Sequence, residues 1–139
     1  MKIITWNCNM AFRKKAEFIL AHKPDILIVP ECEDPEKLKF KPGVPQPTDI
    51  LWFGKNPNKG LGIFSYSDYR FRVLESYNPA FRIVIPVEVT GPDTSFILYA
   101  IWAYNPSDPD GTYIEQVWKA IDYYDKHITN KNTILIGDF

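Results

Sequence analysis

A short apolar run that ends on a carboxylate, Asp25-Ile-Leu-Ile-Val-Pro-Glu31, constrains the fold of this chain most strongly. Four consecutive apolar residues, most of them β-branched, predict a strand that is buried on both faces. Pro30 has no backbone donor, so it predicts the end of that strand. Glu31 follows at once, so a rigid element would hold its carboxylate at the mouth of a sheet. A single glutamate after a strand is usually solvated, so its meaning depends on the other strand ends.

The rest of the chain alternates strand and helix patterns. Apolar residues at helical spacing predict a helix over 12–20, and a second helix begins at Tyr113 after a capping box of Thr112 and Glu115. Strand patterns cover residues 2–7, 25–30, 50–53, 62–65, 72–77, 81–89, 96–102 and 133–138, with a turn over 54–59. Four prolines in residues 32–48 leave a short edge strand or a substrate loop as alternatives there. The pattern predicts one mixed α/β domain over residues 1–139, with a β-sheet packed against helices.

Composition narrows the function without naming it. The net charge of −1 supplies no broad positive field for holding nucleic acid, which weakens that class without excluding it. No apolar run approaches the length of a membrane span and no signal peptide is evident, so a cytoplasmic location is the expectation. The cysteines, Cys8 and Cys32, form no disulfide framework. Each lies next to a candidate site residue, which leaves a disulfide or a soft-metal pair open.

Four predicted strands end on polar side chains: Asn7 with Asn9 beyond it, Glu31, Tyr104 and Asp138. If these ends share one rim of a sheet, two carboxylates, a carboxamide and a phenol converge on one cleft. A few hard oxygen ligands favour Mg²⁺, which is held by one or two carboxylates together with water and substrate phosphate. Such a site suits phosphoester hydrolysis.

The two histidines are not expected in this cleft. His22 follows the first predicted helix, where a basic group suits the negative end of the helix dipole. His127 falls just past the second helix, where a solvated or capping role is expected.

Five motifs in order, spanning residue 5 to the last residue, resemble the endonuclease/exonuclease/phosphatase superfamily. They are Thr5-Trp-Asn7, Val29-Pro-Glu31, Lys59-Gly-Leu-Gly-Ile-Phe-Ser65, Ala103-Tyr-Asn-Pro106 and Ile136-Gly-Asp-Phe139. That superfamily includes AP endonucleases, pancreatic-type deoxyribonucleases, neutral sphingomyelinases and inositol-phosphate phosphatases. The resemblance implies a four-layer α/β sandwich, a mixed β-sheet with helices on the outside, and a phosphoesterase that uses Mg²⁺ or Mn²⁺.

The resemblance also implies roles for individual residues. Asn7 is similar to the asparagine that positions the catalytic acid or the phosphate, and Glu31 is similar to the principal metal ligand. Tyr104 resembles the tyrosine that AP endonucleases place against the scissile phosphate. Asp138 resembles the aspartate that orients the attacking water. The accessory positions are Asn9 and Asn105.

The departures from the family pattern are informative. Asn9 stands where nucleases of this group often carry an acidic residue. Trp102-Ala103 replaces a Thr-His pair of the sphingomyelinase and deoxyribonuclease branches. The sequence also stops one residue before the asparagine of the GDxN motif. We therefore expect an incomplete domain that lacks the family's C-terminal third, with its Ser-Asp-His motif.

Two functions follow as alternatives. The first is a divalent-metal-dependent phosphoester hydrolase, acting on nucleic acid or on a small phosphoester, with negligible activity in this 139-residue form. The second is a non-catalytic binding module that keeps the phosphoesterase scaffold. In either case, a sheet without its full set of neighbours is expected to expose an apolar face, and a homodimer through that face would cover it.

Overall fold

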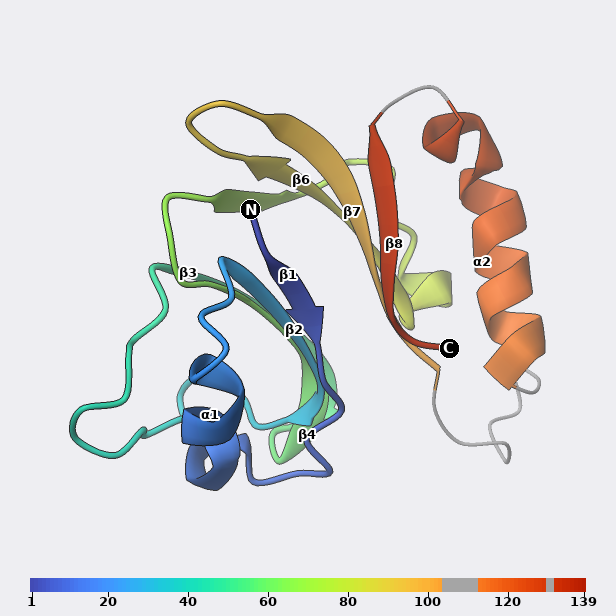
Figure 1. Cartoon of the computed structure of the whole chain (residues 1–139). Helices are drawn as coiled ribbons and strands as arrows, with labels where there is room; N and C mark the ends of the chain where they lie inside the picture. The colour runs from blue at the N-terminus through green and yellow to red at the C-terminus, as the bar shows by residue number, and fades with distance from the viewer. Residues whose placement is uncertain (104–112, 130–131) are drawn as a thin grey trace. The chain divides into compact units, whose positions relative to one another are not determined.

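The structure is a computed structural model that describes residues 1–103, 113–129 and 132–139, without the Tyr113 side chain (Figure 1). The chain divides into two compact units, Met1–Phe71 and Arg72–Phe139. The described residues form two mixed four-stranded sheets and two α-helices, and the predicted α/β class is confirmed. The prediction of a single domain over residues 1–139 and that of a homodimer stay predictions.

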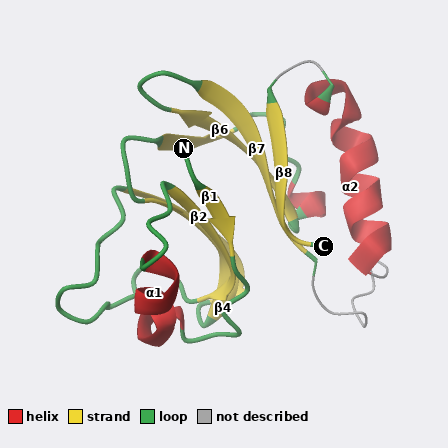
Figure 2. Cartoon of the chain, viewed as in Figure 1, coloured by secondary structure: helices red, strands yellow, loops and turns green. Residues whose placement is uncertain are grey.

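The first sheet has the strand order β1-β2-β4-β3. Its strands are β1 (Ile3–Thr5), β2 (Ile26–Cys32), β3 (Asp49–Asn56) and β4 (Lys59–Ser65), and helix α1 (Phe12–Leu20) connects β1 to β2. β1 and β2 are parallel, while β4 is antiparallel to both β2 and β3. The apolar stripe of α1 packs on one face of this sheet (Figure 2), where Phe12 and Ala16 meet Leu27, Val29 and Phe64.

The second sheet has the strand order β5-β6-β7-β8. It contains β5 (Arg70–Val73), β6 (Val84–Thr90), β7 (Ser95–Trp102) and β8 (Thr133–Asp138), with a short 3-10 helix η1 (Pro79–Phe81) before β6 and helix α2 (Tyr113–Ile128) before β8. β6 is antiparallel to β7, whereas β8 is parallel to β7. The helix α2 buries Val117, Ala120 and Tyr124 in a core with Tyr99 and Ile101 of β7.

The prediction that Pro30 ends its strand is wrong, because β2 continues to Cys32. The Pro30 carbonyl accepts from the Cys8 N–H at 3.3 Å, so this residue faces the β1 side of the strand. The N–H and C=O of a strand residue point to the same side, so the N–H that proline lacks would also have faced β1. At this level β1 has already ended, at Thr5. The bonds to β4 on the other side are unaffected, and the strand therefore continues.

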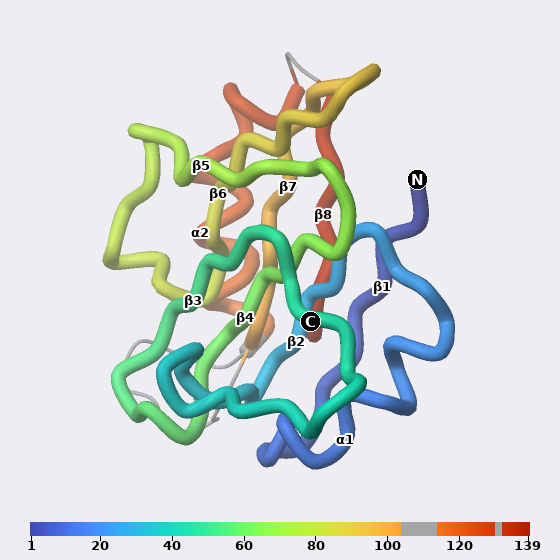
Figure 3. Tube along the Cα trace, turned by 90° about the vertical axis from the view of Figure 1, so that its left-hand side faces the viewer, coloured from blue at the N-terminus to red at the C-terminus, as the bar shows by residue number. Residues whose placement is uncertain are grey.

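Other boundaries also differ from the predictions. The hairpin of β3 and β4 extends further, so the predicted turn over 54–59 narrows to Pro57–Asn58. The predicted strands over 72–77 and 81–89 become 70–73 and 84–90, with η1 between them. Residues 33–48 contain no strand, so the edge-strand alternative for that segment is wrong. Figure 3 traces this segment between β2 and β3. The cap predicted at Thr112 lies outside the described residues, and His127 lies inside the last turn of α2.

Candidate functional site

Glu31 occupies a β-bulge at the end of β2. Pro30 pairs with Leu61 and Cys32 pairs with Gly60, so Glu31 has no partner of its own in the ladder. Its φ of +63° is left-handed, which is unfavourable for a residue with a side chain. Such conformations persist only where the surroundings impose them, and they are concentrated at functional sites. The bulge turns the Glu31 side chain out of the regular alternation of the strand.

Lys59, the first residue of β4, pairs with this carboxylate. Its Nζ lies 3.4 Å from Glu31 Oε1, and the two side chains are 39% and 18% exposed. The Glu31 carboxylate is therefore partly accessible and already has a cation beside it. Lys59 stands in one of the sequence motifs, but no local pattern indicates its role, because the pair joins strands that are far apart in the sequence.

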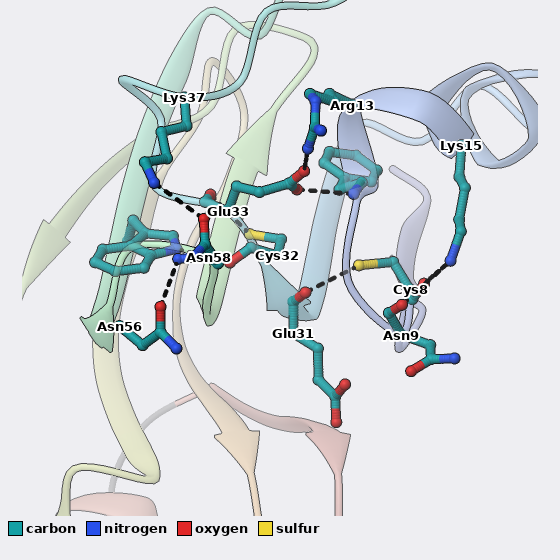
Figure 4. A network of polar contacts seen from close by, with 12 residues as sticks. Cys8, Asn9, Arg13, Lys15, Glu31, Cys32, Glu33, Lys37, Asn56 and Asn58 are labelled. Carbon is teal, nitrogen blue, oxygen red and sulfur yellow. Dashed lines mark hydrogen bonds and ion pairs between the residues drawn. The ribbon is translucent and has the colours of Figure 1, made fainter.

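The loop after β1 holds a second strained segment. Asn9, Met10 and Ala11 all have left-handed φ values, of 48°, 64° and 54°. The Asn7 side-chain oxygen accepts from the Asn9 N–H at 2.9 Å. Lys15 Nζ donates to the carbonyl oxygens of Cys8 and Asn9, at 2.7 and 3.2 Å. These bonds fix the loop, and Figure 4 shows the Asn9 carboxamide and the Glu31 carboxylate on the same side of the polar network.

Glu33 links the loop to β2. Helix α1 begins after Ala11 without a side-chain cap of its own. Instead, Glu33 Oε2 accepts from the Phe12 N–H at 2.7 Å, and Glu33 Oε1 forms an ion pair with Arg13 (Figure 4). Glu33 is 3% exposed and directly follows β2, so its buried carboxylate caps the N-terminus of α1 from a distant part of the sequence. The role of Glu33 was not predicted from the sequence, although the absence of a capping residue before Phe12 was a signal.

The two cysteines are buried free thiols beside the bulge, so no disulfide joins them here. Cys8 Sγ lies 3.3 Å from the Glu31 carbonyl oxygen, and Cys32 Sγ lies 3.5 Å from that of Glu33. Burial is the main cause that raises the pKa of Cys8 to about 11, and burial also raises the pKa of Cys32. Both side chains therefore stay protonated at neutral pH in the metal-free chain, and the soft-metal pair stays a prediction.

Asp138 ends β8 in the second unit, where it pairs with Trp102 of β7. Gly137 precedes it with a φ of +150°, and a Cβ on Gly137 would lie 1.9 Å from the Ile101 carbonyl oxygen. The Ala103 N–H donates to the Asp138 carbonyl oxygen at 2.9 Å. The close approach of β7 and β8 thus fixes the backbone that carries the Asp138 carboxylate.

The structure brings Asn7, Asn9 and Glu31 together at one end of the first sheet. Tyr104 and Asn105 lie outside the described residues, and Asp138 belongs to the other unit, so the shared cleft stays a prediction. His22 is at the opposite end of β1 from Asn7, because its carbonyl oxygen accepts from Lys2 Nζ at 2.8 Å.

The metal predicted for this site has to be judged from its donor atoms. Among the described residues, no three His, Cys, Asp or Glu side chains gather as a metal-binding group. Glu31 and the nearby carboxamides nevertheless offer hard oxygen atoms, and one carboxylate is enough for Mg²⁺ when water and phosphate complete its coordination. The residues present therefore fit Mg²⁺ or Mn²⁺ better than zinc.

None of the described helices is long and apolar enough to cross a membrane.

Comparisons with known proteins identify the fold. No family profile matches the sequence, and no curated protein matches it. Among solved structures, the 3' phosphatase NExo from Neisseria, bound to a product DNA hairpin, is similar over 100% of this chain, with 26% identity and a TM-score of 0.63. The endonuclease domain of TRAS1, a telomere-specific non-LTR retrotransposon, is similar over 98% of this chain, with 14% identity and a TM-score of 0.65.

A third neighbour is TDP2 of D. rerio, in complex with a single-strand DNA product. It is similar over 97% of this chain, with 19% identity and a TM-score of 0.58. This chain spans 57% of the NExo chain and 58% of the TRAS1 and TDP2 chains. Each comparison extends over almost the whole of this chain, which confirms the fold predicted from the sequence motifs.

Proposed function

We propose that this chain, which has the fold of the endonuclease/exonuclease/phosphatase superfamily, is a phosphoester hydrolase that depends on a divalent metal ion. The observation that carries the proposal is the placement of Glu31. A left-handed bulge presents its carboxylate at the end of a strand, beside Asn7 and Asn9. Strain of this kind is a cost to folding that an ordinary solvated glutamate does not require.

Each residue then has a task in the proposed site. Glu31 would hold the ion, and the carboxamides of Asn7 and Asn9 would orient the phosphate and the water around it. Bound Mg²⁺ or Mn²⁺ would neutralise the negative charge that develops on the phosphate oxygens. By the resemblance, Asp138 would accept a hydrogen bond from the attacking water, and Tyr104 would contact the scissile phosphate.

Nucleic acid is the substrate class that the neighbours favour. Two of the similar proteins were solved with DNA products, a hairpin for NExo and a single strand for TDP2. A net charge of −1 gives little electrostatic attraction for the many phosphates of a long duplex. We therefore propose a substrate that is engaged locally, at an end or in a single strand, with small phosphoesters as the alternative class.

The first experiment measures metal binding. Titration calorimetry with Mg²⁺ and with Mn²⁺ would compare the chain with Glu31→Gln, which removes a charged oxygen ligand and keeps the size of the side chain. We expect at least tenfold weaker binding in this variant. Glu36→Gln, an exposed site in the following loop, is the matched control and should bind as the unchanged chain does. Equal metal affinity in the two variants would refute the role of Glu31.

The second candidate is a non-catalytic binding module. It is favoured by Asn9, which offers an amide where nucleases often have a carboxylate, and by the single carboxylate among the three site residues of the first unit. Turnover of bis(p-nitrophenyl) phosphate separates the two candidates. Hydrolysis that requires Mg²⁺ or Mn²⁺ and is lost in Glu31→Gln supports the enzyme. Metal binding that depends on Glu31 but brings no turnover supports the binding module.

A further inference from the structure

The second unit contains a hollow away from the residues assigned so far. It has a volume of about 190 Å³ and lies between the start of α2 and the segment that joins η1 to β6. The described residues that line it are Ala80, Phe81, Arg82, Ile83, Gln116 and Lys119. A volume of this size accommodates about six water molecules. It is below the range of about 300–1,000 Å³ that is usual for a complete small-molecule ligand. The hollow therefore suits one compact group of a larger ligand.

Among the described residues, the polar side chains around this hollow are cationic or neutral. Arg82 and Lys119 supply positive charge, and the buried Gln116 supplies an amide. None of the described residues that line the hollow is acidic. Lys119 makes no hydrogen bond or ion pair with the described residues, although Glu115 and Asp122 lie one turn away on either side of it. An anion with several acceptor oxygens matches this set of donors.

The walls of the hollow are held in place by packing. The Phe81 ring lies 5.0 Å from the Tyr123 ring and 6.2 Å from the Tyr124 ring, measured between centroids. The Tyr124 hydroxyl accepts from the Asn78 N–H at 3.0 Å, and the Asn78 side chain caps η1 by accepting from the Ala80 N–H. These contacts fix η1 against α2, so Arg82 and Lys119 are presented from a preformed site.

The hollow also lies at the same end of the second sheet as Asp138. The Trp102 N–H donates to the Ile83 carbonyl oxygen at 2.9 Å, and Trp102 pairs with Asp138 on its other side. Ile83 and Asp138 are therefore separated by two strand spacings, about 10 Å. A strand of nucleic acid carries successive phosphates at short intervals, and two of them can reach both places.

We propose that this hollow is a phosphate-binding subsite that takes a backbone phosphate of a single-stranded nucleic acid. Arg82 and Lys119 bind the phosphate oxygens, and Gln116 adds an amide hydrogen bond. The pairing with a second phosphate near Asp138 rests on the proposed function, whereas phosphate binding in the hollow does not. The subsite recognises the backbone and not the bases, because it has room for one compact anion.

The test follows backbone amide signals by NMR during titration with inorganic phosphate, at constant ionic strength maintained with chloride. We expect shifts confined to residues 80–83 and 116–119. In Lys119→Gln, phosphate should bind at least tenfold more weakly, and Arg82→Gln should weaken it similarly. Lys126→Gln makes the same charge change further along α2 and should leave binding unaltered. Shifts spread over all basic residues, or equal affinity in Lys119→Gln and Lys126→Gln, would overturn the subsite.

A second arm identifies the source of the phosphate. A single-stranded tetranucleotide should bind at least tenfold more tightly than inorganic phosphate, with the same dependence on Lys119, whereas equal affinity would refute the nucleic-acid assignment. Glu31→Gln separates this proposal from the proposed function. We expect that variant to keep phosphate binding in the hollow even though it loses metal binding, and loss of both would show that the hollow is no independent subsite.

Discussion

The left-handed bulge at Glu31 permits a direct measurement of the strain at the candidate site. The perturbation is a pair of substitutions, Glu31→Ala and Glu31→Gly. Both remove the carboxylate and its ion pair with Lys59, so the contribution of that pair cancels in the comparison. What differs is the backbone, because alanine keeps the steric penalty of a positive φ and glycine does not.

The expected difference follows from two opposing terms. A left-handed conformation costs a non-glycine residue about 1–2 kcal/mol, which Glu31→Gly relieves. Glycine loses about 0.5–1 kcal/mol more backbone entropy than alanine when the chain folds. The net expectation is that Glu31→Gly is more stable than Glu31→Ala by about 0.5–1 kcal/mol. In an ordinary strand the order is reversed.

Reversible urea unfolding, followed by circular dichroism, gives the two free energies of unfolding. The matched control is Glu88 in β6, another strand glutamate with an ion pair, to Arg72 at 2.7 Å, but without a positive φ. There Glu88→Gly should be less stable than Glu88→Ala by about 0.5–1 kcal/mol. If glycine is the less stable substitution at both positions, residue 31 is not strained and the central observation for the site is removed.

Three further predictions concern the surroundings of Glu31. Lys59→Met should tighten Mg²⁺ binding by up to about fivefold. In the unchanged chain Mg²⁺ competes with Lys59 for the Glu31 carboxylate, and a partly exposed ion pair of this kind is worth at most about 1 kcal/mol. Glu33→Ala should lower the free energy of unfolding by about 2–3 kcal/mol, since α1 loses its buried cap and an ion-pair partner. Raising the pH from 9 to 11 should lower stability, because the unfolded Cys8 thiol ionises in that range while the folded one, with a pKa of about 11, retains its proton.

Each of these has a matched control. Lys55→Met, an exposed residue of the same hairpin, should leave Mg²⁺ affinity unchanged, and an equal gain there would indicate a general charge effect. Glu36→Ala should cost less than about 0.5 kcal/mol. Replacing Cys8 with alanine should make the stability profile less steep above pH 9, with the buried Cys32 thiol causing the remaining slope, and an unaltered slope would contradict the assignment to Cys8.

Regular, strongly patterned segments were predictable from the sequence. The helix over 12–20 and the strand over 133–138 have the predicted bounds, because periodicity reports which face is buried. The prediction for Pro30 was wrong because the effect of its missing N–H depends on whether a neighbouring strand lies on the side to which that N–H would point. The same limit applies to the hairpin of β3 and β4, where cross-strand pairing extends both strands past residues with weak local preference for strand, such as Gly54 and Gly60.

The candidate site was predictable only where a residue lies on the end of a strand. Glu31 and Asn7 were placed at one rim from their positions in the sequence. Lys59 and Glu33 were not assigned, because their roles come from contacts across the sheet and with α1 that no local pattern records. The bulge itself was also unforeseen, since nothing local distinguishes a glutamate with a positive φ.

Gly137 has a consequence for how this protein can vary. A methyl group there would collide with the Ile101 carbonyl, and the φ of +150° excludes other residues even if space were made. The residue before Asp138 is therefore closed to substitution, and in a saturation mutagenesis library it should tolerate no replacement. Because only a residue without a side chain fits opposite Ile101, Gly137 also fixes the register of β8 against β7. As the sequence changes by neutral mutation, Asp138 should therefore keep its position opposite Trp102 at the end of β8, even where neighbouring residues are replaced.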